Sequence, residues 1–219
     1  MKQNNNSKIT YLIFAFCLFS LQSFAQFDVK AEELLNSVSK KYEAIKSYKA
    51  EFSYELENLQ AKVNDKFTGE INVKGNKFTL KMGSQMIINN GTTVWTYLKE
   101  ENEVNISDYA PEDDEISPTK IHSMYRQGFK YLLTADETIK KVVYNVVELI
   151  PENKKKPFFK IKIWISKKDK SIFKWKIFEK NGNRYLYSIS KFQPNVKFED
   201  SQFSFDKSKY AGVEVVDLR

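Results

Sequence analysis

The sequence predicts a mainly β protein with two amphipathic helices, and three observations support this fold class. From residue 47 onward, apolar and polar side chains alternate through most of the chain, which is typical of strands with one face on a core and the other in water. Asn90-Gly91 and Asn181-Gly182 separate apolar runs in the manner of tight hairpin turns. Helical spacing of apolar residues appears in segments 29–46 and 117–132. We therefore expect about nine or ten antiparallel strands, an N-terminal helix and a mid-chain helix.

The first 25 residues have the pattern of a secretory signal peptide. Lys2 and Lys8 accompany an almost wholly apolar run over residues 9–19, and small residues surround an expected cleavage site after Ala25. The run is shorter than the roughly 20 residues that cross a bilayer core. Cys17, the one cysteine, follows Phe16 rather than the small residues that lipoprotein processing needs. We expect residues 26–219 to form a single exported domain without a disulfide.

The segment after the cleavage site predicts a helix with one apolar face. Asp28 is a suitable N-cap for a helix over residues 29–46. Glutamate and lysine side chains occupy the opposite face. The apolar face consists of Leu34, Leu35, Val38 and Tyr42, followed by Ile45.

The strands that follow predict a concave apolar surface. In each run, alternate residues are expected to face the same side of the sheet, because the side-chain period of a strand is two. The aromatic share of the chain, 15%, makes this surface unusually bulky. The residues expected on it are Phe52, Tyr54, Phe67, Ile71, Phe78, Leu80, Met82, Ile88, Trp95, Phe173 and Trp175.

The middle of the chain predicts a lid. Residues 110–115 form an acidic stretch, and Ser117-Pro118 is a favourable helix start. A helix between two runs of antiparallel strands has no crossover role, so it can lie across an open end of the sheet. Its expected apolar face consists of Ile121, Met124, Tyr125 and Phe129, continued by Leu132.

The residues needed for most kinds of catalysis are scarce. His122 is the one histidine, and the seven glycines form no phosphate-binding loop, so we expect no metal site, no cofactor and no enzyme activity. Residues 112–115 are the carboxylates available to a hydrolase, but a solvated loop is the simpler interpretation. The net charge of +7 comes mostly from lysines spread along strands, which does not favour nucleic-acid binding. Weak contact with an anionic membrane surface is compatible with it.

Periodicity leaves two interpretations of the bulky inner surface open. An incomplete barrel capped by amphipathic helices can leave an apolar cavity for a ligand. A barrel filled by its own side chains would instead make a structural module of the cell envelope.

Four stretches, in order, resemble the LolA family of periplasmic lipoprotein carriers. They are residues 35–52, 69–78, 87–97, with its Asn-Gly hairpin before Val-Trp-x-Tyr, and 203–217, with its Phe-x-Phe and Gly-Val-x-Val-x-Asp. The resemblance covers essentially all of the chain after the signal peptide. It implies an incomplete antiparallel barrel of the LolA/LolB type, with a helical lid over a cavity for acyl chains and with Phe78 at its mouth. Where family members carry an arginine that latches the lid, this chain has Lys74-Gly75-Asn76.

The resemblance also implies a function and partners. The expected protein is a monomeric periplasmic carrier that takes acylated lipoproteins from an inner-membrane ABC exporter to the outer membrane, where a receptor is a further candidate partner. The main alternative is a shuttle for another lipid or hydrophobic envelope molecule.

Overall fold

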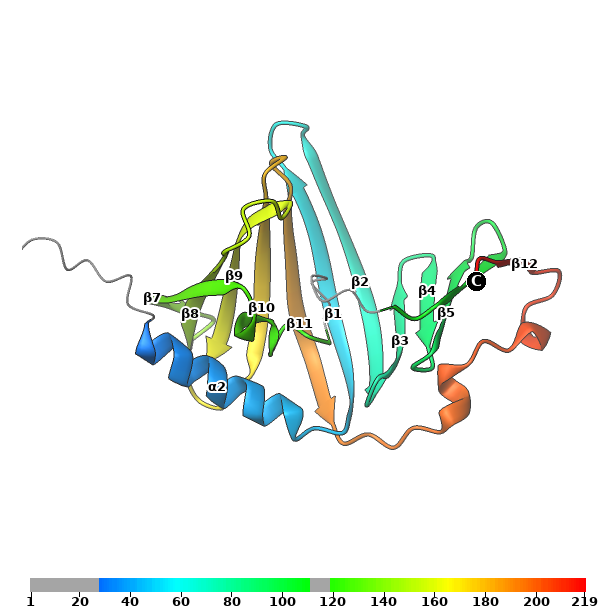
Figure 1. Cartoon of the computed structure of the whole chain (residues 1–219), viewed down its shortest axis with the longest axis horizontal. Coiled ribbons are helices and arrows are strands. Elements are labelled where there is room, and N and C mark those ends of the chain that lie inside the picture. Colours follow the sequence, from blue (N-terminus) through cyan, green and yellow to red (C-terminus); the bar gives the residue numbers. More distant parts are fainter. Residues whose placement is uncertain (1–27, 111–118) are drawn as a thin grey trace, which may run out of the picture.

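The computed structural model describes residues 28–110 and 119–219, which form one curved, open sheet with a helix against its inner face (Figure 1). The expected signal peptide and most of the acidic stretch lie outside the described residues. In the described part of the chain, no helix combines the length and apolar character needed to cross a membrane.

The helix α2 (Val29–Glu43) forms where the sequence predicts it, although it ends three residues early. Asp28 caps it by accepting a hydrogen bond from the Ala31 backbone N–H at 3.1 Å. Leu34, Leu35 and Val38 are buried, so the predicted apolar face is the one that packs on the sheet.

Twelve strands follow, two or three more than expected. They are β1 (Ser47–Asn58), β2 (Val63–Lys74), β3 (Lys77–Met82), β4 (Gln85–Asn89), β5 (Thr93–Leu98), β6 (Glu103–Asp108), β7 (Phe129–Ile139), β8 (Val142–Pro151), β9 (Phe158–Ser166), β10 (Ile172–Glu179), β11 (Arg184–Pro194) and β12 (Glu214–Asp217).

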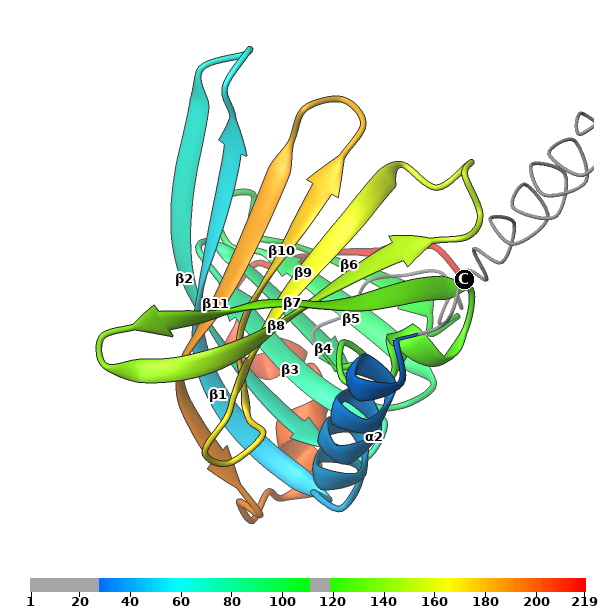
Figure 2. The same cartoon turned by 90° about the vertical axis from the view of Figure 1, so that its left-hand side faces the viewer.

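The sheet order shows that the barrel is incomplete. The order is β12-β6-β5-β4-β3-β2-β1-β11-β10-β9-β8-β7, with β12 and β7 as its two edges. All neighbours pair antiparallel except β12, which runs parallel to β6. The two meanders join where β1 pairs with β11, and the sheet curves around α2 (Figure 2). The prediction of a mainly β fold with an open antiparallel barrel is therefore confirmed.

The predicted mid-chain helix is wrong. A single 3-10 turn, Met124–Arg126, stands in its place, and β7 begins at Phe129 after Gly128 adopts a φ of 69°. Ile121, Tyr125 and Phe129 are four residues apart, a spacing that suits one face of a helix but also one face of a strand. Phe129 forms part of a strand because it pairs with β8. Its side chain then faces inward, while that of Leu132 faces solvent.

The main core lies between α2, segment 119–126 and the inner face of β7 to β11. Val147, Leu149, Ile161 and Ile163 are buried there beneath the apolar face of α2. A second core lies on the opposite, outer face of β3 to β6, where the C-terminal segment covers the sheet. Phe203 from this segment is fully buried.

Candidate ligand-binding site

The inner face holds an enclosed apolar cavity of about 40 Å³ between the lid elements and the sheet. Here the lid means α2 together with segment 119–126, which includes the 3-10 turn. The cavity is lined by Tyr42, Tyr48, Ala50, Phe52, Ile71, Ile121, His122, Ile172, Trp175, Tyr187, Ile189 and Phe192. This volume is close to that of one water molecule, so the lid elements lie close against the sheet.

Three of the sheet residues predicted to face a ligand line this cavity: Phe52, Ile71 and Trp175. Others share their face but lie beyond the cavity. Strand register puts Tyr54 opposite Phe67, on the same side as Phe52. The remaining members, Phe78, Leu80 and Met82, pack against the Phe52 and Ile71 cluster. Phe67 is 44% exposed, because it lies near the free end of the long β1–β2 hairpin.

The predicted lid residues gather over the inner face even though one of the two helices is absent. Leu34, Leu35, Val38, Ile121, Tyr125 and Phe129 are buried in the main core, and Tyr42 and Met124 pack against it. Tyr42 and Ile121 also line the cavity. Phe129 belongs to the sheet rather than to the lid.

Two residues predicted to lie on the concave surface, Ile88 and Trp95, instead lie on the outer face of the sheet. They pair with each other, and Ile88 pairs with Thr79, which alternates with the inward-facing Phe78 and Leu80. The Thr79 hydroxyl donates to the Gln202 carbonyl oxygen at 2.9 Å, so this is the outer face under the C-terminal segment. Ile87 and Ile88 are adjacent and both apolar, and alternation alone could not choose between the two faces.

A third wall residue, Phe173, is also on the outer face. A β-bulge between Ile172 and Lys174 changes the alternation of β10, so Ile172 faces the cavity instead. Phe173 stacks on Tyr144 with ring centroids 4.8 Å apart. The prediction that Phe173 lies on the concave surface is wrong for this reason.

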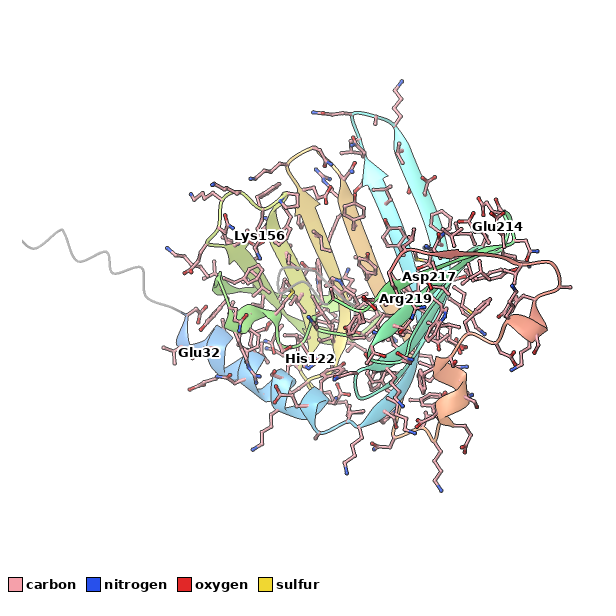
Figure 3. The ribbon with its side chains drawn as sticks, turned by 45° about the vertical axis from the view of Figure 1, so that its right-hand side comes forward. Glu32, His122, Lys156, Glu214, Asp217 and Arg219 are labelled. Atoms are coloured by element: carbon pink, nitrogen blue, oxygen red, sulfur yellow. The ribbon has the colours of Figure 1, made fainter. Side chains whose placement is uncertain are left out.

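Sequence reasoning missed several cavity residues, chiefly on β11. Tyr187 and Ile189 belong to a strand that the alternation predicts. Phe192 comes three residues after Ile189, so strict alternation would place it on the other face of the sheet. A bulge near Ser190 brings both Ile189 and Phe192 onto the inner face. His122 stacks on Tyr42 with ring centroids 5.6 Å apart, and no pattern in the sequence indicated that contact. Figure 3 shows His122 beside α2.

Polar contacts hold the lid to the sheet. The Tyr42 hydroxyl accepts a hydrogen bond from the Ile172 backbone N–H at 3.0 Å. A carboxylate oxygen of Asp28 accepts one from the Leu133 N–H at 2.8 Å. Lys41 donates to the Asp169 carbonyl oxygen at 2.8 Å.

Within the lid, two further contacts join the segment before β7 to α2. Tyr125 donates to Asn36, and Arg126 pairs with Glu43 at 2.5 Å. In the stretch 74–76, where the resemblance to the LolA family implies a latch arginine, Lys74 contacts Asp200 and the Phe198 carbonyl oxygen in the C-terminal segment. The polar contacts of the lid described above involve other residues.

Burial controls the ionisation of groups around the cavity. It raises the pKa of the Tyr48 and Tyr42 hydroxyls, so both phenols are neutral at physiological pH. Burial also lowers the pKa of His122, although Glu43 nearby partly opposes this. The cavity is uncharged at neutral pH, as an apolar ligand requires.

A larger pocket of about 550 Å³ opens beside the cavity, at the end of the inner face where β9 begins and β10 ends. We call it the mouth pocket. Tyr187 lines both spaces. The mouth pocket is lined by Tyr54, Asn153, Lys155, Lys156, Pro157, Phe158, Ile177, Glu179, Tyr185 and Tyr187.

The side chains that line these two spaces are suited to binding a ligand. The cavity offers aromatic rings, aliphatic groups and phenols, and the described residues contain no group of histidine, cysteine, aspartate and glutamate side chains arranged to hold a metal. A curved open sheet with an apolar cavity under a lid defines a binding protein of the half-barrel type. The chain belongs to the LolA family, since residues 43–206 match the family described as outer membrane lipoprotein carrier protein LolA. That description is of a carrier and not of an enzyme.

The structure is similar to several solved structures at low sequence identity. An uncharacterized conserved protein from Thermus thermophilus matches with a TM-score of 0.57 and 13% identity, over 86% of this chain and 99% of that one. A LolA superfamily protein from Nitrosomonas europaea gives a TM-score of 0.42 at 12% identity, over 80% and 98%. LprF from Mycobacterium bovis gives 0.47 at 12% identity, over 78% and 97%. No curated protein matches this chain significantly.

Proposed function

We propose that this protein is a periplasmic carrier that binds the acyl chains of lipoproteins on its inner face and moves them from the inner to the outer membrane. The observation that carries the proposal is the enclosed apolar cavity between the lid and the sheet, in a chain of the LolA family. An exposed acyl chain costs about 0.8 kcal/mol per methylene in water, so transport through the periplasm requires such a shelter.

The small cavity volume fits a carrier in its empty state. The main core packs the apolar face of α2 directly on the sheet, and an acyl chain would take the place of that contact. Apolar contacts are non-directional, so α2 can exchange the sheet for an acyl chain at little net cost. The few polar contacts of the lid then define the closed position and limit how easily it opens.

Loading and release need partners, and the proposal includes them. Extraction of a lipoprotein from a membrane needs an energy source, which an inner-membrane ABC exporter supplies. Delivery needs an acceptor in the outer membrane, either a receptor or the membrane itself. The signal peptide over residues 1–25 would bring the domain into the periplasm.

The competing function is a shuttle for another lipid or hydrophobic envelope molecule, since the same cavity suits any acyl chain. Mass spectrometry of molecules that co-purify with the exported protein distinguishes the two. A purified triacylated lipoprotein that remains in solution only with the carrier, and moves to acceptor vesicles, supports the lipoprotein function. Binding of free lipids without lipoprotein solubilisation supports the alternative.

A matched pair of variants tests whether the inner face carries the ligand. Ile189 lines the cavity, whereas Ser188 faces outward, where it pairs with Lys174 and Ser53. Ile189→Glu should abolish lipoprotein solubilisation, because a bound acyl chain would bury the new carboxylate unpaired. Ser188→Glu should leave it unchanged. Equal solubilisation by both variants would contradict binding on the inner face.

A further inference from the structure

Two adjacent turns at one end of the half-barrel are rich in lysine. The Lys167 backbone N–H, in the β9–β10 loop, donates to the Val143 carbonyl oxygen beside the β7–β8 turn at 3.1 Å. Figure 2 shows the β9–β10 loop at the lower end of the sheet and the β1–β2 and β10–β11 turns at the upper end. We call the lysines of the two adjacent turns the basic end: Lys140 and Lys141 in the β7–β8 turn, and Lys167, Lys168 and Lys170 in the β9–β10 loop.

Most of the positive charge of the basic end is not neutralised within the chain. Lys167 pairs with Asp136 at 2.5 Å. The acid in the β9–β10 loop, Asp169, pairs with Lys41 of α2 at 3.5 Å. Within residues 28–110 and 119–219, the other four ammonium groups of the basic end have no ion pair: those of Lys140, Lys141, Lys168 and Lys170.

The basic end holds its lysines at a conformational cost. Lys140 and Lys141 have φ angles of 48° and 68°, because both central residues of such a two-residue hairpin turn need positive φ. Lys170 has a φ of 61°. Side chains with a Cβ are disfavoured in this region, and Asn-Gly is the preferred pair for the turn. Strained residues concentrate at functional sites, so the two lysines point to a function for their charge.

Exposed apolar side chains accompany these lysines. Val142 and Val143 directly follow the β7–β8 turn and are 41% and 39% exposed. Lysine adds its own apolar stem below the ammonium group. Protein interfaces are depleted in lysine and enriched in arginine, and the basic end has no arginine. Lysines beside exposed apolar groups therefore favour the headgroup layer of an anionic bilayer over an acidic protein surface.

The basic end adjoins the lid and the enclosed cavity. Lys41 of α2 donates to the Asp169 carbonyl oxygen in the β9–β10 loop at 2.8 Å. Ile172, just after this loop, lines the cavity, and its N–H donates to the Tyr42 hydroxyl. A membrane that meets the basic end therefore lies close to the C-terminal part of α2 and to the cavity beneath it.

We propose that the basic end docks this protein on the surface of an anionic phospholipid bilayer. This inference rests on the proposed function and adds to it the surface with which the carrier meets a membrane. The four unpaired ammonium groups lie among the lipid phosphates, and Val142 and Val143 contact the headgroup layer. Salt screens such an attraction, so docking is weak and reversible, as a carrier that must leave the membrane requires.

Sedimentation with vesicles tests the docking on the exported protein without cargo. One set of vesicles is phosphatidylcholine with about one third phosphatidylglycerol, and the other is phosphatidylcholine alone. Each lysine near an anionic surface strengthens binding about fivefold, so we expect at least tenfold tighter binding to the anionic vesicles at about 0.1 M salt. Raising the salt to about 0.5 M should remove most of this difference.

A variant of the β7–β8 turn assigns the binding to the basic end. Lys140→Asn/Lys141→Gly introduces the residues that the turn prefers and removes two charges. We expect its melting temperature to rise, because the strain of the turn is relieved, and its binding to anionic vesicles to weaken about tenfold or more. A loss of binding in a more stable protein cannot be due to unfolding.

The matched control removes the same charge from the opposite end of the sheet. Lys62 and Lys154 lie in the β1–β2 turn and the β8–β9 loop, exposed and without an ion pair among the described residues. At about 3.3 Å per residue, the length of β9 separates the two ends by about 30 Å, which exceeds the Debye length of about 10 Å at 0.1 M salt. Lys62→Asn/Lys154→Asn should therefore bind anionic vesicles within about threefold of the unmodified protein.

Different failures overturn different claims. Equal binding of both kinds of vesicle by the unmodified protein overturns the membrane as the partner and leaves an acidic protein surface for the basic end. Full binding by Lys140→Asn/Lys141→Gly, or an equal loss in the control variant, overturns the assignment to the basic end. Lipoprotein solubilisation needs no vesicle, so failed docking with intact solubilisation leaves the carrier function standing. Failure of the unmodified protein to solubilise lipoprotein contradicts the carrier function itself.

Discussion

The Tyr125 hydroxyl donates a hydrogen bond to the Asn36 side-chain oxygen at 2.7 Å, which ties the segment before β7 to the middle of α2. Both residues belong to the lid, and Tyr125 is buried in the main core at the same time. The bond therefore links the position of segment 119–126 to the position of α2. Opening of the lid by movement of α2 alone must break it.

Tyr125→Phe should loosen the lid without emptying the core. The variant keeps the ring but loses one hydrogen bond, so we expect unfolding to become easier by about 1 kcal/mol. Uptake of a fluorescent fatty acid should become faster, which stopped-flow fluorescence measures. Tyr97→Phe is the matched control, since it removes a similar bond to Asn102, 3.2 Å long, away from the lid. Equal acceleration in both variants would contradict the proposed role of Tyr125.

Most of the fold follows from periodicity, and the failures have identifiable physical causes. Alternation correctly predicted the inner face of β1, β2 and β3, where Ile71 is paired with Leu80 and Phe52 packs in the same cluster. It failed where a bulge intervenes, as at Phe173 in β10. A bulge has no marker in the sequence that periodicity can detect.

The outer core was the second source of error. Ile88 and Trp95 lie on the face that the C-terminal segment contacts through Thr79 and Gln202, and local alternation contains no information about a segment more than one hundred residues away. The prediction of a mid-chain helix failed because a spacing of four residues suits both a helix and a strand. The existence of a lid was predictable from apolar residues at 121–129, but its secondary structure was not.

The stability of the protein should fall between pH 7 and pH 5.5. Burial lowers the pKa of His122, so in this range the unfolded chain takes up a proton that the folded chain resists. The unfolded state then binds more protons, and the free energy of unfolding decreases as the pH falls below the ordinary histidine pKa of about 6.5. The decrease ends once the pH is below the lowered pKa of the folded state.

His122→Phe keeps a ring against Tyr42 and removes the titration. Because His122 is the one histidine in the chain, the variant should show a flat melting temperature over this pH range. Glu43 and Arg126, the charged groups that act on His122, keep their charges throughout it. A variant that retains the slope of the unmodified protein would show that another group titrates.

Phe203→Ala should separate stability from binding. Phe203 is fully buried on the outer face and packs edge-on against Phe198, with centroids 5.7 Å apart. Removing its ring should cost about 3 to 5 kcal/mol in a urea titration. Ligand affinity at low temperature, where the variant is still folded, should stay within about twofold of the unmodified protein, because the inner face is intact. A large loss of affinity would instead connect the outer core to the ligand site.

The position of the acyl chain is the central claim, and tryptophan quenching by a brominated fatty acid tests it most directly. The chain has three tryptophans, of which Trp175 lines the cavity, while Trp95 and Trp164 lie on the outer face. Bromine quenches only at close contact. In Trp95→Phe/Trp164→Phe, the remaining Trp175 should be quenched strongly as the ligand binds. In Trp175→Phe, binding should leave the emission of the other two unchanged. Quenching that persists in Trp175→Phe, or is missing when Trp175 stands alone although the ligand binds, would contradict an acyl chain on the inner face.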